Sequence, residues 1–135
     1  MAANINPIFP LTPKIGWGTI ATANTAKDGT GTVVSIFTAG ADGARVDRVR
    51  IWYTGTCVAT VLRIFINNGS TNATATNNSL IQEITVPAAT LSEVAAQSGI
   101  NVLLDMAIPA GYVINCTIGT TVAAALVVTA EGGDY

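Results

Sequence analysis

β-branched residues dominate this chain, because Val, Ile and Thr together fill 46 of its 135 positions. Branching at Cβ restricts the rotamers that a side chain can adopt in a helix, whereas the same side chains fit the pleated surface of a sheet. Turn signals rich in Gly, Asn, Asp and Pro recur about every ten residues, which is the spacing typical of a β-sandwich or barrel. The sequence therefore predicts an all-β protein.

Eight segments carry strand patterns between these turns, and they predict the architecture. The segments are 15–23, 32–39, 45–54, 57–67, 80–86, 101–108, 112–118 and 122–130. A chain of this length has enough surface to bury for one core and too little for two domains. Eight mostly antiparallel strands in a single domain predict a jelly-roll-like antiparallel β-sandwich over 15–135.

The first fourteen residues differ from the rest of the chain. Pro7, Pro10 and Pro13 each lack a backbone N–H group, which a central strand needs for its hydrogen bonds. Residues 1–14 are therefore predicted to form an extended N-terminal arm. Fully extended, such an arm would span up to about 45 Å.

The segment 57–67 is apolar on both of its faces. Leu62 and Ile64 point to one side of the predicted strand, and Phe65 lies beside Arg63 on the other. A strand with one face in water alternates apolar with polar residues, so the second face is predicted to lie under another sheet or another subunit. Charged residues make up 10% of the chain, against about 25% in an average soluble protein. This shortage predicts that like copies shield one another in an oligomer.

Two connecting segments have local patterns of their own. Residues 68–79 contain neither a charge nor a large apolar side chain, which predicts an exposed loop. In 87–99, Thr90 and Glu93 match a capping box and Gly99 matches a helix stop, which predicts one or two helical turns in a crossover. A partner-binding helix is the alternative there. Residues 131–135 are predicted to follow the last strand.

The composition argues against an enzyme, a metal site and a cofactor. There is no histidine, so the commonest general base is missing, and Cys57 and Cys116 are too few for a four-cysteine zinc site. We expect these two thiols to be buried hydrophobic groups and not a disulfide. Glu83 and Asp105 lie mid-strand, as the paired carboxylates of a glycosidase would, but mid-strand arginines favour ion pairs instead.

Net charge and hydropathy bear on the partners and on the location of the protein. A net charge of −2 gives no basis for binding nucleic acid or an anionic membrane. The N-terminus has neither a basic region nor a continuous apolar run, so no secretory signal is expected. Residues 106–130 are uncharged, but Pro109, Gly111 and Gly119 interrupt them and period-two alternation favours strands over a membrane helix.

Four stretches of turn and strand residues carry a resemblance to a known group of proteins. They are the Pro-rich start with Ile15-Gly16-Trp17-Gly18 and Thr22-Ala23-Asn24, then Phe37 to Gly43, then Arg63 to Gly69, and finally Ile108 to Tyr112 with Gly119 to Ala124 and the end Gly132-Gly133-Asp134-Tyr135. In these stretches the chain resembles small structural proteins of tailed bacteriophages, of the capsid decoration or cement type. The resemblance implies a β-sandwich subunit of a virion, commonly a trimer, that binds the major capsid protein or other virion proteins. It implies no catalytic residues.

The candidate interface combines the arm with mid-strand charges. The arm residues expected to anchor neighbouring subunits are Ile5, Pro7, Ile8, Phe9, Pro10 and Leu11. Arg48, Arg50 and Arg63 are expected to pair with Asp47, Glu83 or Asp105 around the interface, where arginine is enriched and ion pairing sets register. Two alternatives stay open, namely a tail, neck or fibre component and a carbohydrate-binding module that uses the tryptophans.

Overall fold

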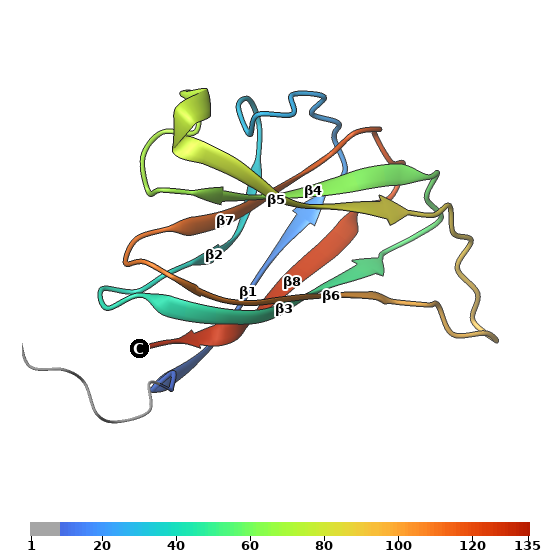
Figure 1. Ribbon diagram of the computed structural model, residues 1–135. Helices are drawn as coiled ribbons and strands as arrows, with labels where there is room; N and C mark the ends of the chain where they lie inside the picture. Colours follow the sequence, from blue (N-terminus) through green and yellow to red (C-terminus); the bar gives the residue numbers. More distant parts are fainter. Residues whose placement is uncertain (1–8) are drawn as a thin grey trace, which may run out of the picture.

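The computed structural model describes residues 9–135, which form eight strands and one short 3-10 turn, η1 (Ala75–Asn77). The strands are β1 (Thr12–Ile20), β2 (Val34–Thr38), β3 (Ala44–Tyr53), β4 (Thr60–Asn67), β5 (Asn78–Val86), β6 (Ile100–Ile108), β7 (Val113–Ile118) and β8 (Leu126–Asp134). They lie in two stacked layers of four strands (Figure 1). Neighbouring strands run antiparallel throughout, so the predicted all-β antiparallel sandwich is confirmed.

The strand order identifies the sandwich as a jelly roll. One sheet has the order β1-β8-β3-β6 and the other β2-β7-β4-β5. Strand β1 thus pairs with β8, β2 with β7, β3 with β6 and β4 with β5. This is the order that results when one long antiparallel ribbon, doubled back between β4 and β5, wraps around itself into two Greek keys. The jelly-roll-like fold expected from the sequence is therefore confirmed.

The core lies between the two layers and is filled by alternate residues of each strand. On β3, Val46, Val49 and Ile51 are fully buried, and the residues between them face outward. The other sheet contributes, among other residues, Leu62, Ile64, Ile114 and Ile118. Each of these side chains stabilises the fold by about 1.5–3 kcal/mol relative to exposure in water.

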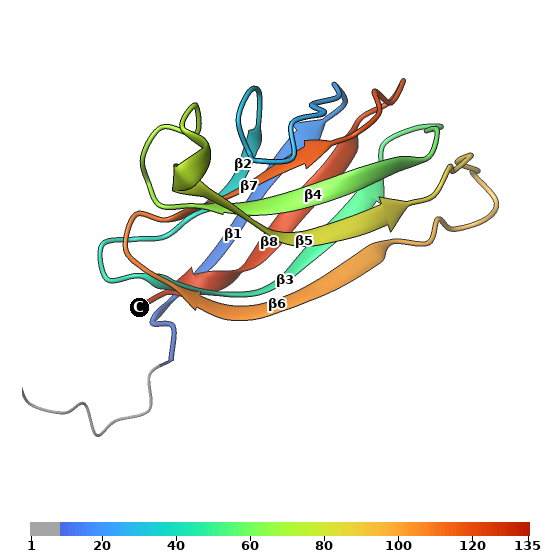
Figure 2. The same ribbon diagram turned by 45° about the horizontal axis from the view of Figure 1, so that its top comes forward.

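The second face of β4 is buried by the chain itself, which corrects one expectation. Phe65 faces away from the core, yet it is fully buried, and Arg63 on the same side is 7% exposed. The sequence predicts that a second sheet or another subunit covers this face. The connections 21–33 and 68–77 instead rise on this side of the β2-β7-β4-β5 sheet (Figures 1 and 2). Phe65 and Arg63 are thus buried within one chain, whereas Val61 and Ile66 on the same strand are partly buried. The burial of Phe65 needs no covering subunit.

The loop between β4 and β5 is ordered by asparagine side chains. Asn72 donates from Nδ2 to the carbonyl oxygens of Gly29, at 3.2 Å, and Gly31, at 2.7 Å, which ties the loop to the β1–β2 connection. Asn67 donates to Oδ1 of Asn78 at 2.8 Å. The loop is mostly exposed, as expected, but it is shorter than predicted because residues 78 and 79 already belong to β5.

The segment between β5 and β6 contains no helical turn, so the prediction of one or two turns is wrong. Ala89 exchanges two backbone hydrogen bonds of 2.9 Å with Cys57, which keeps the start of the segment extended. Gln97 binds both the N–H (2.9 Å) and the carbonyl (3.2 Å) of Tyr53 through its side-chain amide. These tertiary contacts hold the backbone in an irregular path and override the local capping pattern.

Two strand boundaries also differ from those expected. β1 begins at Thr12, so the last three residues of the predicted arm are part of the sheet, where they pair with Asp134, Gly133 and Gly132. β8 begins at residue 126 and continues to 134, through residues expected to follow it. Pro13 is tolerated because β1 is an edge strand. Of the predicted arm, residues 1–8 lie outside the described residues.

Candidate interaction surface

The outer face of the β1-β8-β3-β6 sheet, meaning the side turned away from the core, is the candidate interaction surface. Residues directly opposite each other on paired strands project from the same side of a sheet. The register places Ile15, Glu131, Arg48 and Leu103 in one row across all four strands. Ile15 is 60% exposed and Leu103 79% exposed. The row is therefore apolar at both edges of the sheet and charged in the middle.

Two tryptophans extend this surface along the strands. Trp17 on β1 is 67% exposed and belongs to the next row, which crosses Arg50 on β3. Trp52 on β3 is 40% exposed and lies one row further. Single exposed apolar residues are ordinary, but several on one sheet face form a patch of the kind found at interaction sites. Four strands make this face about 14 Å wide.

Close packing between the sheets forces Ile15 and Trp17 outward. A Cβ atom on Gly16 would lie 2.0 Å from the carbonyl oxygen of Ile36 on β2, and one on Gly18 would lie 2.3 Å from a methyl carbon of Val34. The inner side of β1 therefore has room only for glycine at these two positions. Because side chains alternate along a strand, the large apolar residues must face solvent.

A compact ion cluster occupies the middle of the surface. Glu131 on β8 accepts a hydrogen bond from Nε of Arg48, and its Oε1 lies 2.9 Å from Nε of Arg50. One carboxylate thus holds two guanidinium groups, and this cluster of three keeps one net positive charge. At the start of β3, Arg45 contacts Asp105 and lies 3.2 Å from Asp47. Asp105 has φ +47° where β6 bulges opposite Asp47.

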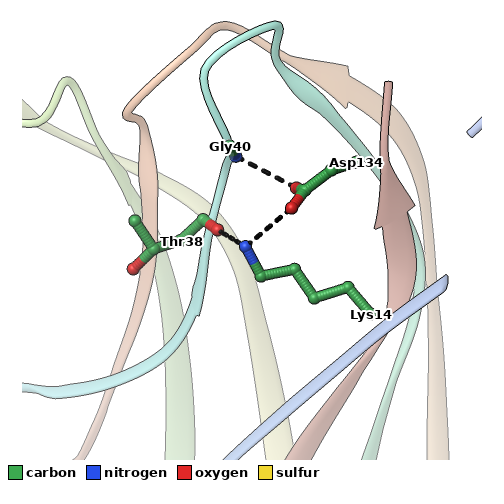
Figure 3. A network of polar contacts seen from close by, with 4 residues as sticks. All are labelled: Lys14, Thr38, Gly40 and Asp134. Carbon is green, nitrogen blue, oxygen red and sulfur yellow. Dashed lines mark hydrogen bonds and ion pairs between the residues drawn. The ribbon is translucent and has the colours of Figure 1, made fainter. Parts of the chain in front are cut away.

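The origin of the arm is fixed beside this surface by a network that joins β1, β2 and β8 (Figure 3). Lys14 reaches from β1 to the carbonyl oxygen of Thr38 and to Oδ2 of Asp134, at 3.0 Å. The amide of Gly40 donates to Oδ1 of Asp134 at 3.0 Å. The amide of Leu11 also donates to the Asp134 carbonyl oxygen at 2.8 Å. The described residues just before β1 are therefore anchored to the sheet edge at Leu11.

The residues predicted for the interface fall on both sides of the sandwich. Arg48 and Arg50 lie together on the surface defined above, but their partner is Glu131 and not one of the predicted acids. Arg63 pairs with Glu83 at 3.0 Å on the opposite sheet. Phe9, Pro10 and Leu11 precede β1, and the side chains of Phe9 and Leu11 are exposed. Contacts between subunits through these residues stay a prediction.

Sequence reasoning missed the apolar part of the surface. Ile15, Trp17 and Leu103 were not among the predicted interface residues, and neither was Glu131. One signal was present, since alternation of glycine with large apolar residues from Ile15 to Gly18 marks a strand with a very small face. The small face packs against a neighbour, and the large face is left to solvent or to a partner. For Leu103 no such signal exists, because Leu104 is equally apolar.

Within 9–135 no three His, Cys, Asp or Glu side chains gather as metal ligands would, and that part of the chain forms no helix long and apolar enough to cross a membrane. Two of the pockets have volumes of about 390 Å³ each. Both cysteines are free and buried, and burial raises the pKa of the Cys116 thiol to about 12.

Comparison with known proteins gives little further information. No protein-family model matches the chain, and no curated protein matches it. Among solved structures the chain is similar to one titled "Structure of infectious bursal disease virus Gx strain", with 11% sequence identity and a TM-score of 0.35. The similarity covers 98% of this chain but 37% of that chain, so this chain spans little more than a third of its length. Function must therefore be argued from the residues of the chain itself.

Proposed function

We propose that this chain is a structural protein of a tailed-bacteriophage virion that self-associates, with a trimer favoured, and decorates the capsid. The observation that carries the proposal is the outer face of the β1-β8-β3-β6 sheet, where Ile15, Trp17 and Leu103 are exposed in the single chain. Removing apolar surface from water stabilises a complex by about 25 cal/mol per Å². Contact with a neighbouring protein through this face is therefore favourable.

The composition of the face supports this role. Tryptophan and arginine are enriched at the centres of protein interfaces, and Trp17 lies in the same row as Arg50. The ion cluster around Glu131 is already paired within the chain, so a partner need not supply all of its counter-charges. The anchored start of the arm beside Asp134 allows residues 1–8 to reach a neighbour by strand addition or wrapping.

The proposed partners are further copies of the chain and the major capsid protein or other virion proteins, so the proposed location is the virion. The resemblance of the sequence to phage virion proteins of the decoration type supports a place in the virion, and among the sites in the virion the capsid is our first choice. A carbohydrate-binding module is the second candidate, because Trp52 is partly exposed beside a pocket of about 390 Å³ that also contains Leu91 and Gln97. A shift of tryptophan fluorescence on addition of sugars would favour that candidate.

Light scattering during gel filtration tests self-association. The purified chain is expected to elute as a closed oligomer, with a trimer at three times the chain mass of 13.8 kDa. Replacing Trp17 and Leu103 by serine should shift it towards the monomer without changing its melting temperature, because both side chains are mainly exposed. Val94→Ser is the matched control, since Val94 is also an exposed apolar side chain but lies on the β5–β6 connection.

Two results would contradict the proposal. The first is a monomer at about 100 μM, because a contact with a Kd of a few micromolar would be largely formed at that concentration. The second is an oligomer that the double serine variant leaves intact. Electron microscopy with the gold-labelled protein then separates the sites of action, because a decoration subunit should bind assembled heads and leave tails unlabelled. Labelled tails would favour a tail, neck or fibre component.

A further inference from the structure

We infer that residues 1–11 of one copy dock in an apolar groove at the end of the sandwich of the next copy, so that copies join end to end. The inference rests on the proposed function and names a second surface through which copies associate. Three connections, 54–59, 87–99 and 119–125, form this end of the sandwich, which we call the tip. The 87–99 connection and the C-terminus lie at opposite ends of the molecule (Figures 1 and 2).

Hydrogen bonds between the three connections give the tip a fixed shape. Ala89 exchanges two backbone hydrogen bonds of 2.9 Å with Cys57. The thiol of Cys57 donates to the carbonyl oxygen of Ala124 at 2.9 Å. The amide of Thr54 donates to the carbonyl oxygen of Ala125 at 3.0 Å. Each connection is thereby tied to another, so the hollows between them are formed before a partner binds.

Three neighbouring hollows at the tip make up the groove. Two of them have volumes of about 390 Å³ each. The third, of about 270 Å³, connects them, because it shares Ala89 with the one and Ala96 with the other. The two larger volumes fall within the range of about 300–1,000 Å³ that is typical of ligand sites. Trp52, Leu91 and Val58 add larger apolar side chains to the lining.

The tip and the N-terminal residues are matched in polarity. Glu93 is the one charged residue in the sequence of the three connections. Residues 1–11 contain no charged side chain, and their large apolar side chains include Ile5, Ile8, Phe9 and Leu11. Phe9 and Leu11 are 70% and 83% exposed in the single chain. Contact between two such segments buries apolar surface, at about 25 cal/mol per Å², and requires little desolvation of charge.

The prolines of the N-terminal segment suit a groove that contains aromatic residues. Pro7 and Pro10 each fix φ near −65°, so less conformational entropy is lost on binding. Segments with two prolines at this spacing are a known class of ligand for aromatic-lined grooves. Trp52, which is 40% exposed, and Tyr53 each line one of the hollows. Because Trp52 also belongs to the candidate interaction surface, the groove continues that surface around the end of the sheet.

The N-terminal residues are too few to fill the groove of their own copy. Thr12 lies opposite Asp134 at one end of β1. Ile20 lies at the other end, opposite Leu126, which directly follows the tip. These two ends are about 26 Å apart along the strand. Phe9 lies three residues before β1, and the eight residues before it extend over at most about 29 Å. Turned straight back, they would end near the rim of the tip, whereas the segment of another copy meets no such limit.

An end-to-end contact joins two different surfaces of the chain, so it is heterologous. Heterologous contacts close into a ring when the rotation between copies allows it, and otherwise continue as an open stack. A ring of three copies agrees with the trimer favoured above. An open stack agrees with a tail or fibre component.

Disulfide cross-linking of the full chain tests the contact, because Cys57 and Cys116 are both buried. The double variant Ile8→Cys, Ala96→Cys, oxidised with copper phenanthroline, should give covalent dimers and trimers of the 13.8 kDa chain on a denaturing gel. Ile8→Cys combined with Thr71→Cys is the matched control, since Thr71 is exposed on the β4–β5 loop away from the tip. This control should stay monomeric on the gel.

The pattern of bands decides the outcome. A series that ends at the trimer supports docking in a ring, and a longer series supports docking in an open stack. Cross-links confined to a single chain mean that the segment folds back on its own copy, which overturns the inference. Equal cross-linking in the control overturns it as well, and so does the absence of cross-links from a variant that is still oligomeric.

Ala96→Lys tests the groove without added cysteines. Ala96 is exposed in the single chain, so the melting temperature should stay unchanged. Docking of an apolar segment would bury the new charge, so self-association should weaken at least about tenfold. Val94→Lys adds the same charge on the same connection, but Val94 lines none of the three hollows. It should weaken self-association by less than about twofold.

Equal effects of the two lysine variants overturn the inference. Loss of binding to phage heads by Ala96→Lys with unchanged self-association also overturns it, because a capsid protein would then occupy the groove. The two proposals fail separately. A monomeric native chain contradicts the proposed function, whereas an oligomer that depends on Trp17 and Leu103 but not on Ala96 contradicts this docking alone.

Discussion

Asp134 connects parts of the chain that are far apart in sequence. It lies at the end of β8 and accepts hydrogen bonds from Lys14 on β1 and from the Gly40 amide after β2. Burial alone would raise the pKa of the Asp134 carboxyl, but these hydrogen bonds and the Lys14 charge together hold that pKa below its ordinary value of 3.8. The ionised form therefore stabilises the folded state at neutral pH.

Asp134→Asn should lower the free energy of unfolding by about 1 kcal/mol at pH 7, because the ion pair with Lys14 is lost and a hydrogen bond to a charged group becomes a neutral one. A depressed folded-state pKa contributes stability above the unfolded value and loses it as pH falls through the folded value. The difference between the two proteins should therefore shrink below about pH 4. Urea unfolding at pH 7 and pH 3 measures it.

Asp42→Asn is the control for this prediction, since Asp42 is an exposed carboxylate in the turn before β3. It should change stability by less than about 0.5 kcal/mol at either pH. A destabilisation by Asp134→Asn that is the same at both pH values would mean that the carboxylate charge has no part in the network.

At the scale of elements, β1 has its small residues inside and its large residues outside. This arrangement is the reverse of an ordinary edge strand, and it follows from the close approach of β2 at Gly16 and Gly18. The same feature closes the sandwich on one side and creates the apolar surface on the other. Packing within the chain and exposure of Trp17 thus have one structural cause.

Gly16→Ala should destabilise the fold by about 3 kcal/mol, the upper part of the range for overpacking a closely packed site. The added Cβ would lie 2.0 Å from a backbone oxygen of Ile36, which can only move with β2. Urea unfolding provides the measurement, and Thr19→Ala, an exposed position on the same strand, is the control. A loss below about 1 kcal/mol would show that the two strands can separate at little cost.

At the scale of the whole molecule, the two outer sides of the sandwich differ. The side formed by β2-β7-β4-β5 is covered in part by the chain, and Phe65 is buried there without a partner chain. The β1-β8-β3-β6 side has no such cover and exposes Trp17 and Leu103. The β1-β8-β3-β6 face is therefore the one suited to contact with neighbours.

Deletion of residues 1–8 should separate folding from assembly. The eight strands of the described residues 9–135 do not include residues 1–8, so the free energy of unfolding should change by less than about 0.5 kcal/mol. Under the proposed function, the truncated chain should form a weaker oligomer, which light scattering over a dilution series would detect. An unchanged oligomer would restrict assembly to the sheet face, and a large loss of stability would contradict the independence of the jelly roll from these residues.

Much of the fold could be predicted from the sequence, because its signals are local. Alternation and turn residues located all eight strands, with ends that shifted by a few residues where pairing with β8 extends them. The capping pattern at Thr90 and Glu93 failed, since contacts of Ala89 and Gln97 with distant residues hold the backbone there. The sequence could predict that the mid-strand arginines form ion pairs, but not with which acid. Glu131 is the partner of Arg48 because β3 and β8 are neighbours in the sheet.

The sequence by itself determined that the chain forms sheets, since branching at Cβ and the spacing of turns are local properties that do not depend on distant residues. Only the tertiary structure decided which face of each sheet is covered. Phe65 and Trp17 are equally apolar to a reader of the sequence, yet one is buried and the other exposed. The reason is that burial depends on which distant strand or loop lies opposite, and this is set by the winding of the whole ribbon.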